Sequence, residues 1–285
     1  MVYEATIITP AESCKREVRT VSDWLLNLPV VWMAIVILGT TYVFAAGVYA
    51  VVTALAKGDR GRAFKAISPG MLPPLAVVFA LLVGFLAAQV WSDADRANTA
   101  VNREASALRA VVLLASGFPP ATETHLRELV RRQIQDAATQ EWPVMAHRHA
   151  TLTIAPAPLV EALQMAIALN PQNQGQAAAQ REIVGSLQAA LEARRQRIIL
   201  SGSSVNWVKW TALLLQGGLT LVTIAMIHSD NRVANRIILT IFATGIGIAL
   251  VLIAAHSGPF TGQLSVQPSV LLQVMPEGGP PASPP

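Results

Sequence analysis

The sequence predicts an all-α membrane protein with four transmembrane helices, whose long helices extend into an extramembrane helical domain inserted between spans 2 and 3. The chain has 285 residues, of which 53% are hydrophobic and only 13% are charged, whereas soluble domains carry roughly 25% charged residues. Segments 24–56, 66–92, 210–229 and 237–276 contain no Asp, Glu, Lys or Arg. Each is longer than the roughly 18 apolar residues that indicate a membrane-spanning helix, so the chain is predicted to be integral to a lipid bilayer.

The first two spans occupy residues 30–92 and follow a polar leader, residues 1–29. Tryptophan favours the level of the lipid headgroups, so Trp32 marks the entry to a first span at about 30–55. A short basic linker leads to the segment SPGMLPP, whose prolines stop any preceding helix. The second span is predicted from about 73 to 91, ending near Gln89.

Residues 93–205 have an ordinary density of charge and read as a helical extramembrane domain. No proline separates Leu75 from Ser116, so the second span is predicted to continue beyond the bilayer as one helix. Three further helices are predicted, from Thr122 to about Trp142, over 157–169 and over 173–200.

The third and fourth spans lie within residues 206–257, at about 207–227 and 237–256. The segment 228–236 is predicted to form a tight turn between them. The tail, residues 258–285, is rich in Gly and Pro, and we expect its last ten residues to be disordered.

Positive charge in the short loops indicates the orientation, because cytoplasmic loops of membrane proteins are enriched in Lys and Arg. The loops after the first and third spans carry six such residues: Lys57, Arg60, Arg62, Lys65, Arg232 and Arg236. We therefore expect a cell inner-membrane protein whose loops are cytoplasmic, with the helical insert and both termini outside the cytoplasm.

Within the spans, small and hydroxyl residues take the place of ionisable ones. Phe85 and Gln89 lie one helical turn apart near the end of the second span and are a candidate constriction and filter of a pore. Thr220 and Thr244 are candidates to line the same path. The alternative use of the threonines is packing, because a threonine hydroxyl readily bonds to its own helix backbone.

Charged residues of the insert suggest a second group of sites. Glu104 and Glu141 each lie among apolar neighbours, and an arginine group containing Arg194 and Arg197 precedes the third span. One hypothesis pairs Glu104 or Glu141 with these arginines, fixing the helices of the insert against one another. The alternative is that the arginines anchor the helix at anionic headgroups. Around an axial opening, Arg194 and Arg197 would also attract anions.

Catalytic, cofactor and metal motifs are not recognisable in the sequence. It has no nucleophile elbow and no phosphate-binding glycine loop, and its single cysteine rules out an intrachain disulfide. His147 and His149 are two residues apart and do not share a helix face. The basic residues are scattered among acids, which disfavours nucleic acid as a partner. We expect no enzyme, no cofactor and no bound metal.

The order of several motifs around the spans resembles the bestrophin-like domain family of bacterial membrane proteins. The motifs are WSDADRANTAVNREASAL at 91–108, EWP at 141–143, ARRQR at 193–197 and PFTGQLSVQP at 259–268. The residues that match the family pattern are Glu104, Glu141, Trp142, Arg194, Arg197, Pro259 and Phe260. The acidic calcium-clasp run of true bestrophins is missing from this sequence.

The resemblance implies a four-span subunit of an oligomeric ion channel whose pore lies on the symmetry axis. We therefore expect passive ion conduction, of anions in the first instance, by a homo-oligomer in contact with lipid and inorganic ions. The alternative function is a non-conducting membrane scaffold or sensor whose helical insert binds a partner or ligand.

Overall fold

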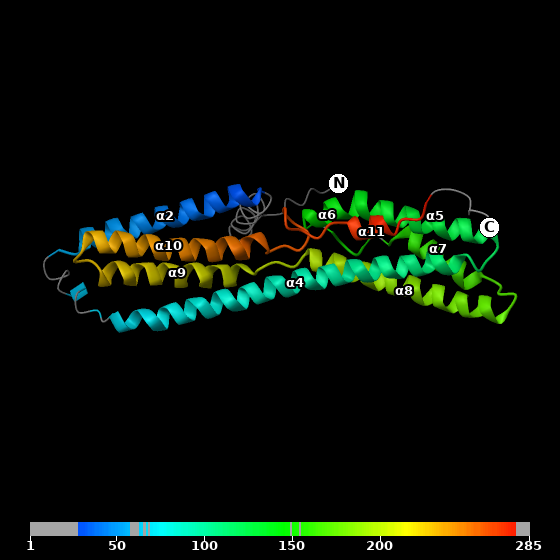
Figure 1. The fold of residues 1–285 in the computed structure, drawn as a ribbon, viewed down its shortest axis with the longest axis horizontal. Coiled ribbons are helices and arrows are strands. Elements are labelled where there is room, and N and C mark those ends of the chain that lie inside the picture. Colours follow the sequence, from blue (N-terminus) through cyan, green and yellow to red (C-terminus); the bar gives the residue numbers. More distant parts are fainter. Residues whose placement is uncertain are drawn as a thin grey trace, which may run out of the picture. The chain divides into compact units, whose positions relative to one another are not determined.

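The computed structural model describes residues 28–57, 63–64, 67, 69–148, 150–153 and 155–277. Its principal helices are α2 (Val30–Leu55), α4 (Leu72–Ala115), α5 (Pro120–Asp136), α6 (Trp142–Ala146), α7 (Ala157–Ala168), α8 (Gln174–Ser201), α9 (Trp207–Ile227), α10 (Arg232–Ala255) and α11 (Ser269–Gln273) (Figure 1). A 3-10 turn, η1 (Pro69–Met71), precedes α4, and a π-helical turn, η2 (Ala137–Glu141), joins α5 to α6. No strand occurs among the described residues, and the predicted all-α class is confirmed.

The chain divides into two compact units. Unit 1 comprises Met1–Val90 and Ser204–Ser257, and unit 2 comprises Trp91–Ser203 and Gly258–Pro285. The helix α4 contributes its first part to unit 1 and the remainder to unit 2, as one uninterrupted helix of 44 residues. This continuity follows from the sequence, because Pro73 and Pro74 lie in the first turn of α4, where proline is tolerated, and the next proline is Pro119.

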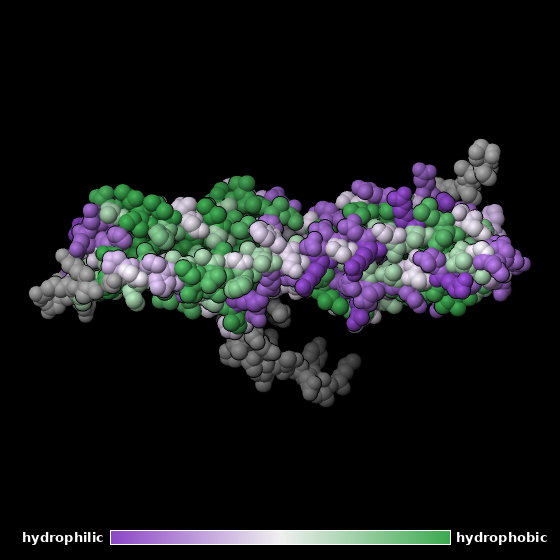
Figure 2. Space-filling model, turned by 60° about the horizontal axis from the view of Figure 1, so that its bottom comes forward, coloured by the Kyte–Doolittle hydropathy of each residue, from purple (hydrophilic) through white to green (hydrophobic). Residues whose placement is uncertain are grey.

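Unit 1 holds the four helices that are long and apolar enough to cross a membrane: α2, the start of α4, α9 and α10. Hydrophobic residues, drawn in green, gather over this unit in Figure 2. Val43, Phe44 and Ile241 are among its exposed apolar side chains. Lipid tails provide the environment for such a surface. The fold is therefore that of a four-span membrane protein, as the sequence predicts.

The turn between α9 and α10 is shorter than predicted. Residues 228–236 are predicted to form it, but α10 already begins at Arg232. The side chain of Asn231 accepts hydrogen bonds from the backbone N–H groups of Val233 and Ala234. This N-cap satisfies donors that a helix leaves open at its start, so the charged residues after it join the helix.

In unit 1, α10 packs against both α2 and α9, and the three helices form a bundle. Gly247 of α10 permits the approach to α2, because a Cβ at this position would lie 2.6 Å from Cδ2 of Leu38. The span part of α4 is far less enclosed: 11% of its most apolar window is buried, against 39% for α10. A Cβ at Gly84 of α4 would meet no atom within 4 Å, so the described residues leave the helix open at this position.

Unit 2 is a helical domain with its own apolar core. The core includes Leu108 of α4, Leu129 of α5, Leu159 of α7 and Leu187 of α8, all of them buried. The side chain of Asn173 caps α8 by accepting a 2.8 Å hydrogen bond from the backbone N–H of Gln176.

The C-terminal tail contains structure that the sequence analysis did not predict. Residues 258–277 pack within unit 2, with Phe260 and Leu271 buried, and include the short helix α11. Of the last ten residues, for which disorder is expected, 278–285 lie outside the described residues. The leader 1–29 lies outside them too, apart from Leu28 and Pro29.

Candidate functional site

Four charged side chains meet in the interior of unit 2. They come from three elements: Glu104 from α4, Glu141 from the π-helical turn η2, and Arg194 and Arg197 from α8. Residues three apart on a helix share one face, so α8 directs both arginines to the same side. We call these four residues the charge cluster.

Arg197 lies at the centre of the charge cluster. Its Nε donates to Oε2 of Glu104 at 2.8 Å and its Nη2 donates to Oε1 of Glu104 at 3.1 Å, a bidentate pair. The same Nη2 donates to Oε2 of Glu141 at 2.7 Å. Arg194 completes the cluster, because its Nε donates to the second oxygen of Glu141, Oε1, at 2.7 Å. Both carboxylates therefore have guanidinium partners.

Burial makes these contacts energetically important. The side chains of Arg197 and Glu104 are both 0% exposed, and those of Arg194 and Glu141 are 8% and 18% exposed. A charge withdrawn from water to this extent is tolerated only when it is paired and hydrogen-bonded. The four formal charges sum to zero, so the cluster leaves no net charge in the core.

The pKa values of the central pair reflect this burial. Burial raises the pKa of the Glu104 carboxyl, and the Arg197 guanidinium opposes that rise. Burial alone would lower the pKa of Arg197, but Glu104 and Glu141 outweigh it and raise that pKa. Arg197 is therefore held in its charged form.

Two consecutive residues contact Arg197: Glu141, the last residue of the π-helical turn, and Trp142, the first residue of α6. Pro143 has no N–H to donate to the preceding turn, and π-turns add one residue to a helix turn, often at functional sites. Next to this turn, the Arg197 guanidinium lies over the Trp142 ring, with Cζ 4.6 Å from the ring centroid. Nη1 of Arg197 donates to the sulfur of Met145, also on α6, at 3.4 Å.

Trp142 links the charge cluster to the C-terminal tail. Its indole Nε1 donates to the backbone carbonyl of Val266 at 3.0 Å. Its ring meets that of Phe260 edge to face, with centroids 5.7 Å apart at 83°. The tail closes on itself at this place, because the N–H of Val266 donates to the carbonyl of Pro259 at 2.8 Å. The cluster and the tail thus form one continuous set of contacts.

The four charge candidates of the sequence analysis are therefore brought together, and the geometry is that of the pairing hypothesis. Glu104 pairs with Arg197, and Glu141 bridges Arg194 and Arg197. The arginines lie inside the unit and face carboxylates, an arrangement that favours a structural use over attraction of ions. Sequence reasoning missed Met145 and Val266, which have no charge or motif of their own to mark them.

The four pore candidates lie in unit 1: Phe85 and Gln89 share one face of α4, Thr220 lies on α9 and Thr244 on α10. Phe85 of α4 is 71% exposed, and Gln89 accepts a hydrogen bond from Nζ of Lys209 on α9. Thr220 is 2% exposed and donates to the carbonyl of Gln216, so its side chain lies inside the unit. Thr244 donates to the carbonyl of Thr240 at 2.7 Å, and its hydroxyl lies 2.9 Å from that of Tyr42. Both threonines thus make the packing contacts that the sequence analysis gave as the alternative.

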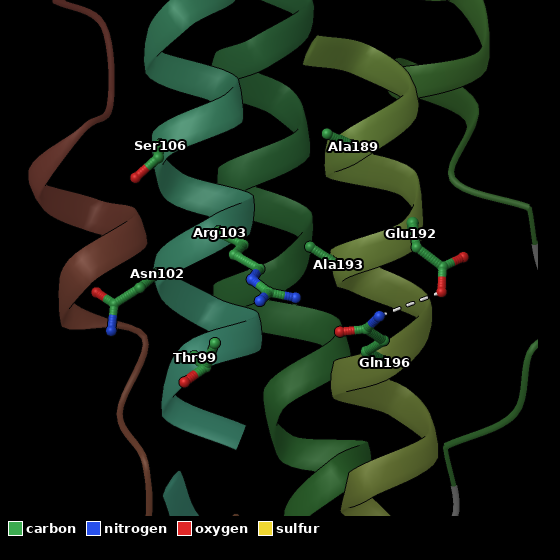
Figure 3. A pocket seen from close by; sticks show the side chains of 8 residues that line it. All are labelled: Thr99, Asn102, Arg103, Ser106, Ala189, Glu192, Ala193 and Gln196. Atoms are coloured by element: carbon green, nitrogen blue, oxygen red, sulfur yellow. Dashed lines mark hydrogen bonds between the residues drawn. The ribbon is translucent and has the colours of Figure 1, made fainter. Parts of the chain in front are cut away.

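A shallow groove of about 500 Å³ lies between α4 and α8 in unit 2 (Figure 3). Its polar lining residues include Asn102 and Arg103 of α4 and Glu192 and Gln196 of α8, and Gln196 donates to Glu192 at 3.3 Å. Across the described residues, no group of three His, Cys, Asp or Glu side chains is arranged to hold a metal ion. The groove is open to solvent, whereas the charge cluster is buried in the interior of the unit.

Comparison with known proteins places the chain in a family. The model of the Bestrophin-like domain matches residues 29–271. The chain belongs to the Bestrophin-like domain family. Among functionally curated proteins, none matches it.

Solved structures share the bestrophin-like fold at low sequence identity. A point mutant of a bacterial bestrophin homologue from Klebsiella pneumoniae is 12% identical, with a TM-score of 0.65, over 85% of this chain and 97% of that one. A second mutant of that homologue is 11% identical, with a TM-score of 0.63, over 85% and 96%. A structure described as a membrane protein is 12% identical, with a TM-score of 0.65, over the same shares. The resemblance to the bestrophin-like family is confirmed.

The residues that carry the bestrophin-like pattern in the sequence converge in space. The four members of the charge cluster, together with Trp142 and Phe260, form one set of contacts, and Pro259 supports Val266 beside them. The motifs of α4, of EWP, of ARRQR and of the tail are therefore parts of a single site. That site joins four segments of unit 2 that are distant in sequence.

Proposed function

We propose that the chain is a subunit of a homo-oligomeric ion channel, with a passive pore on the axis between copies. The observation that carries this proposal is membership of the Bestrophin-like domain family across residues 29–271, together with a complete four-span unit. Four spans rarely enclose a pathway by themselves, so the pore is assigned to the space between subunits.

The exposure of α4 supports the choice of the helix that lines this pore. Of the four spans, α4 has the smallest buried share of its most apolar window, 11%. Ala80, Gly84 and Ala88, spaced four residues apart, are exposed on it and leave room for a close neighbour. A helix with such a face is suited to contact further copies of the chain.

Phe85 and Gln89 are the proposed constriction and filter. They are four residues apart on α4 and so share one face, and Phe85 is 71% exposed. Rings of apolar side chains gate channels by excluding water from a narrow opening. The charge cluster, in this proposal, is the structural centre of the extramembrane domain and takes no part in conduction.

The orientation remains the one proposed from loop charge, in a cell inner membrane. Lys57, Arg232 and Arg236 lie at the ends of α2 and α10, and Arg60, Arg62 and Lys65 lie outside the described residues. Cytoplasmic loops would place the insert and both termini on the opposite side. A reporter that is active only in the cytoplasm, fused to the C-terminus, tests this orientation. The fusion should give no signal, and a signal would contradict the orientation.

Purified protein in planar bilayers tests the channel. Unitary currents are expected from the natural chain, and Phe85→Ala is expected to enlarge them because the smaller side chain widens the opening. Ile241→Ala, a truncation of another exposed apolar side chain, on α10, is the matched control and should leave the current unchanged. Silence of the natural chain across a range of salts would favour the non-conducting scaffold instead.

A further inference from the structure

Three exposed cations belong to one end of unit 1: Lys57, Arg232 and Arg236. Lys57 follows the last turn of α2, and the two arginines lie one turn apart at the start of α10. In Figure 1, α2 ends at the end of the bundle where α10 begins.

The contacts between α2 and α10 place these three cations at one level. The hydroxyl of Tyr42 on α2 lies 2.9 Å from that of Thr244 on α10. One turn earlier on α2, Leu38 lies against Gly247, so the two helices run in opposite directions. From the Tyr42 contact, the end of α2 is 13 residues on and the start of α10 is 12 residues back. At 1.5 Å per residue, both ends lie roughly 18–20 Å beyond that contact.

Positive charge exceeds negative charge at this end. Among the described residues, none of the three cations forms an ion pair, and Asp230 is the carboxylate closest to them in sequence. In the sequence, the connection from α2 to α4 adds one acid and three cations: Asp59, Arg60, Arg62 and Lys65. The two connections and the start of α10 thus hold six cations and two carboxylates. At least four positive charges remain after any pairing with these acids.

An exposed aliphatic stripe begins beside the two arginines. Val233 and Ile237 follow Arg232 and Arg236 directly in the chain, and their side chains are 60% and 56% exposed. Ile241, one turn further along α10, is 62% exposed. Residues four apart share one helix face, so the arginine row and the aliphatic row run side by side. Nε of Arg236 donates to the backbone carbonyl of Arg232 at 3.2 Å, which directs this guanidinium toward the start of the helix.

We propose that this end of α2 and α10 binds an anionic phospholipid such as phosphatidylglycerol, with its phosphate at Arg232, Arg236 and Lys57. A guanidinium matches the geometry of phosphate oxygens, and clustered basic residues at the ends of spans recognise anionic headgroups. The acyl chains would lie along Val233 and Ile237. A zwitterionic lipid is held less strongly, because its own ammonium compensates its phosphate.

The site goes beyond the proposed channel function and does not depend on it. Basic loops can act on a membrane through charge alone, wherever they lie. Here the cations adjoin a particular lipid-facing stripe, so the recognised molecule is an amphiphile with an anionic head. Inorganic phosphate, which has the head but no chains, should bind far more weakly.

Native mass spectrometry of the purified protein tests the site. The protein is titrated in detergent with phosphatidylglycerol or with phosphatidylcholine of the same acyl chains, and bound lipids are counted after detergent release. The natural chain should bind phosphatidylglycerol at lower concentration. Arg232→Gln combined with Arg236→Gln should weaken that binding about thirtyfold, since each basic residue near an anionic headgroup contributes about fivefold. Binding of phosphatidylcholine should change by no more than about twofold.

A matched control removes the same charge elsewhere. Arg103→Gln combined with Arg195→Gln takes two exposed arginines from unit 2, outside the apolar spans, and should leave the lipid preference unchanged. Arg232→Lys combined with Arg236→Lys keeps both charges and should keep most of the preference, which separates charge from a change of fold. Equal melting temperatures and elution volumes check that each variant is folded and assembled.

Three results would overturn the lipid site. The first is equal affinity of the natural chain for the two lipids, and the second is unchanged binding of phosphatidylglycerol by the double glutamine variant. The third is displacement of the bound lipid by excess inorganic phosphate, which would show that the phosphate group alone is recognised. None of these measurements uses conduction, so silence of the natural chain in planar bilayers would overturn the channel and leave the lipid site standing.

Discussion

The guanidinium of Arg197 binds the carboxylate of Glu104 through two hydrogen bonds, of 2.8 and 3.1 Å, and both side chains are completely buried. This pair joins α8 to α4, and Glu141 and Trp142 extend it to the π-helical turn and to the tail. One side chain therefore contacts three segments of unit 2 directly and a fourth through Trp142. The consequences of removing it are large enough to measure.

Replacing Arg197 by methionine should strongly destabilise unit 2. Loss of one partner from a buried ion pair leaves an uncompensated charge, which costs about 3–5 kcal/mol. Thermal unfolding of the purified protein in detergent measures the loss. Arg195→Gln is the control, because that side chain is 60% exposed and lies 3.6 Å from Glu192, so its removal should cost no more than about 0.5 kcal/mol. If Arg197→Met melted at the same temperature as the natural protein, the role given to the Arg197–Glu104 pair would be contradicted.

The same variant should recover stability in acid. Burial already raises the pKa of Glu104 from its ordinary value of 4.5, and Arg197 limits the rise. Without Arg197 the pKa of the folded state rises further, so the folded chain holds the proton more tightly than the unfolded chain does. The resulting stabilisation is complete below pH 4.5 and is lost as the pH rises through the folded-state pKa.

Melting temperatures of Arg197→Met measured from pH 7 down to pH 4.5 should therefore approach those of the natural protein. Glu104→Gln combined with Arg197→Met removes the titrating group and is the control, whose difference from the natural protein should vary less over this range. A deficit in Arg197→Met that stays constant or grows on acidification would contradict the assignment of its instability to an unpaired Glu104.

Trp142→Phe should loosen the tail without disturbing the helices of unit 2. The substitution keeps an aromatic ring but removes the indole N–H that binds the carbonyl of Val266. An unsatisfied buried carbonyl costs about 1–3 kcal/mol. Limited proteolysis followed by mass spectrometry should detect faster cleavage within residues 258–277.

Gln267→Ala is the control for this experiment. The Gln267 side chain is exposed, and its hydrogen bonds reach only Ser265 of the same segment. Equal cleavage rates for Trp142→Phe and the natural chain would indicate that other contacts hold the tail.

Two neighbouring glycines of α10 should respond very differently to substitution. A Cβ at Gly247 would lie 2.6 Å from Cδ2 of Leu38, whereas a Cβ at Gly245 would meet nothing within 4 Å. Gly247→Val should therefore destabilise unit 1 by about 1–3 kcal/mol through overpacking against α2. Gly245→Val should be tolerated, and thermal unfolding in matched detergent compares the two. Equal melting temperatures would contradict the close approach of α10 to α2.

The helices themselves were largely predictable from the sequence. Long uncharged runs bounded by Trp, Asn and Pro predict the bounds of α2, α4 and α9 within one or two residues. This works because a segment in the bilayer core must satisfy its own backbone hydrogen bonds, and a continuous apolar helix does so. The start of α10 was misplaced, because the charged residues from Arg232 to Arg236 read as a turn. The cap by Asn231 carries these residues into the helix instead.

The four charge candidates were predictable as a group, but their partners were not. The sequence marks Glu104 and Glu141 as acids among apolar neighbours, yet it does not say which arginine each one meets. The pairing depends on how α4, η2 and α8 pack. Glu141 contacts Arg197 from a π-helical turn, and no hydrophobic periodicity in the sequence marks such a turn.

By itself, the sequence determined that this protein crosses a membrane four times as helices. Its four long uncharged segments expose more apolar surface than a soluble protein of this composition could shield from water. Only the tertiary structure decided that Arg194 and Arg197 are neutralised inside unit 2, that the tail docks on Trp142, and that Lys209 binds the amide of Gln89. These contacts join residues distant along the chain, and hydropathy and local periodicity carry no information about which distant side chains meet.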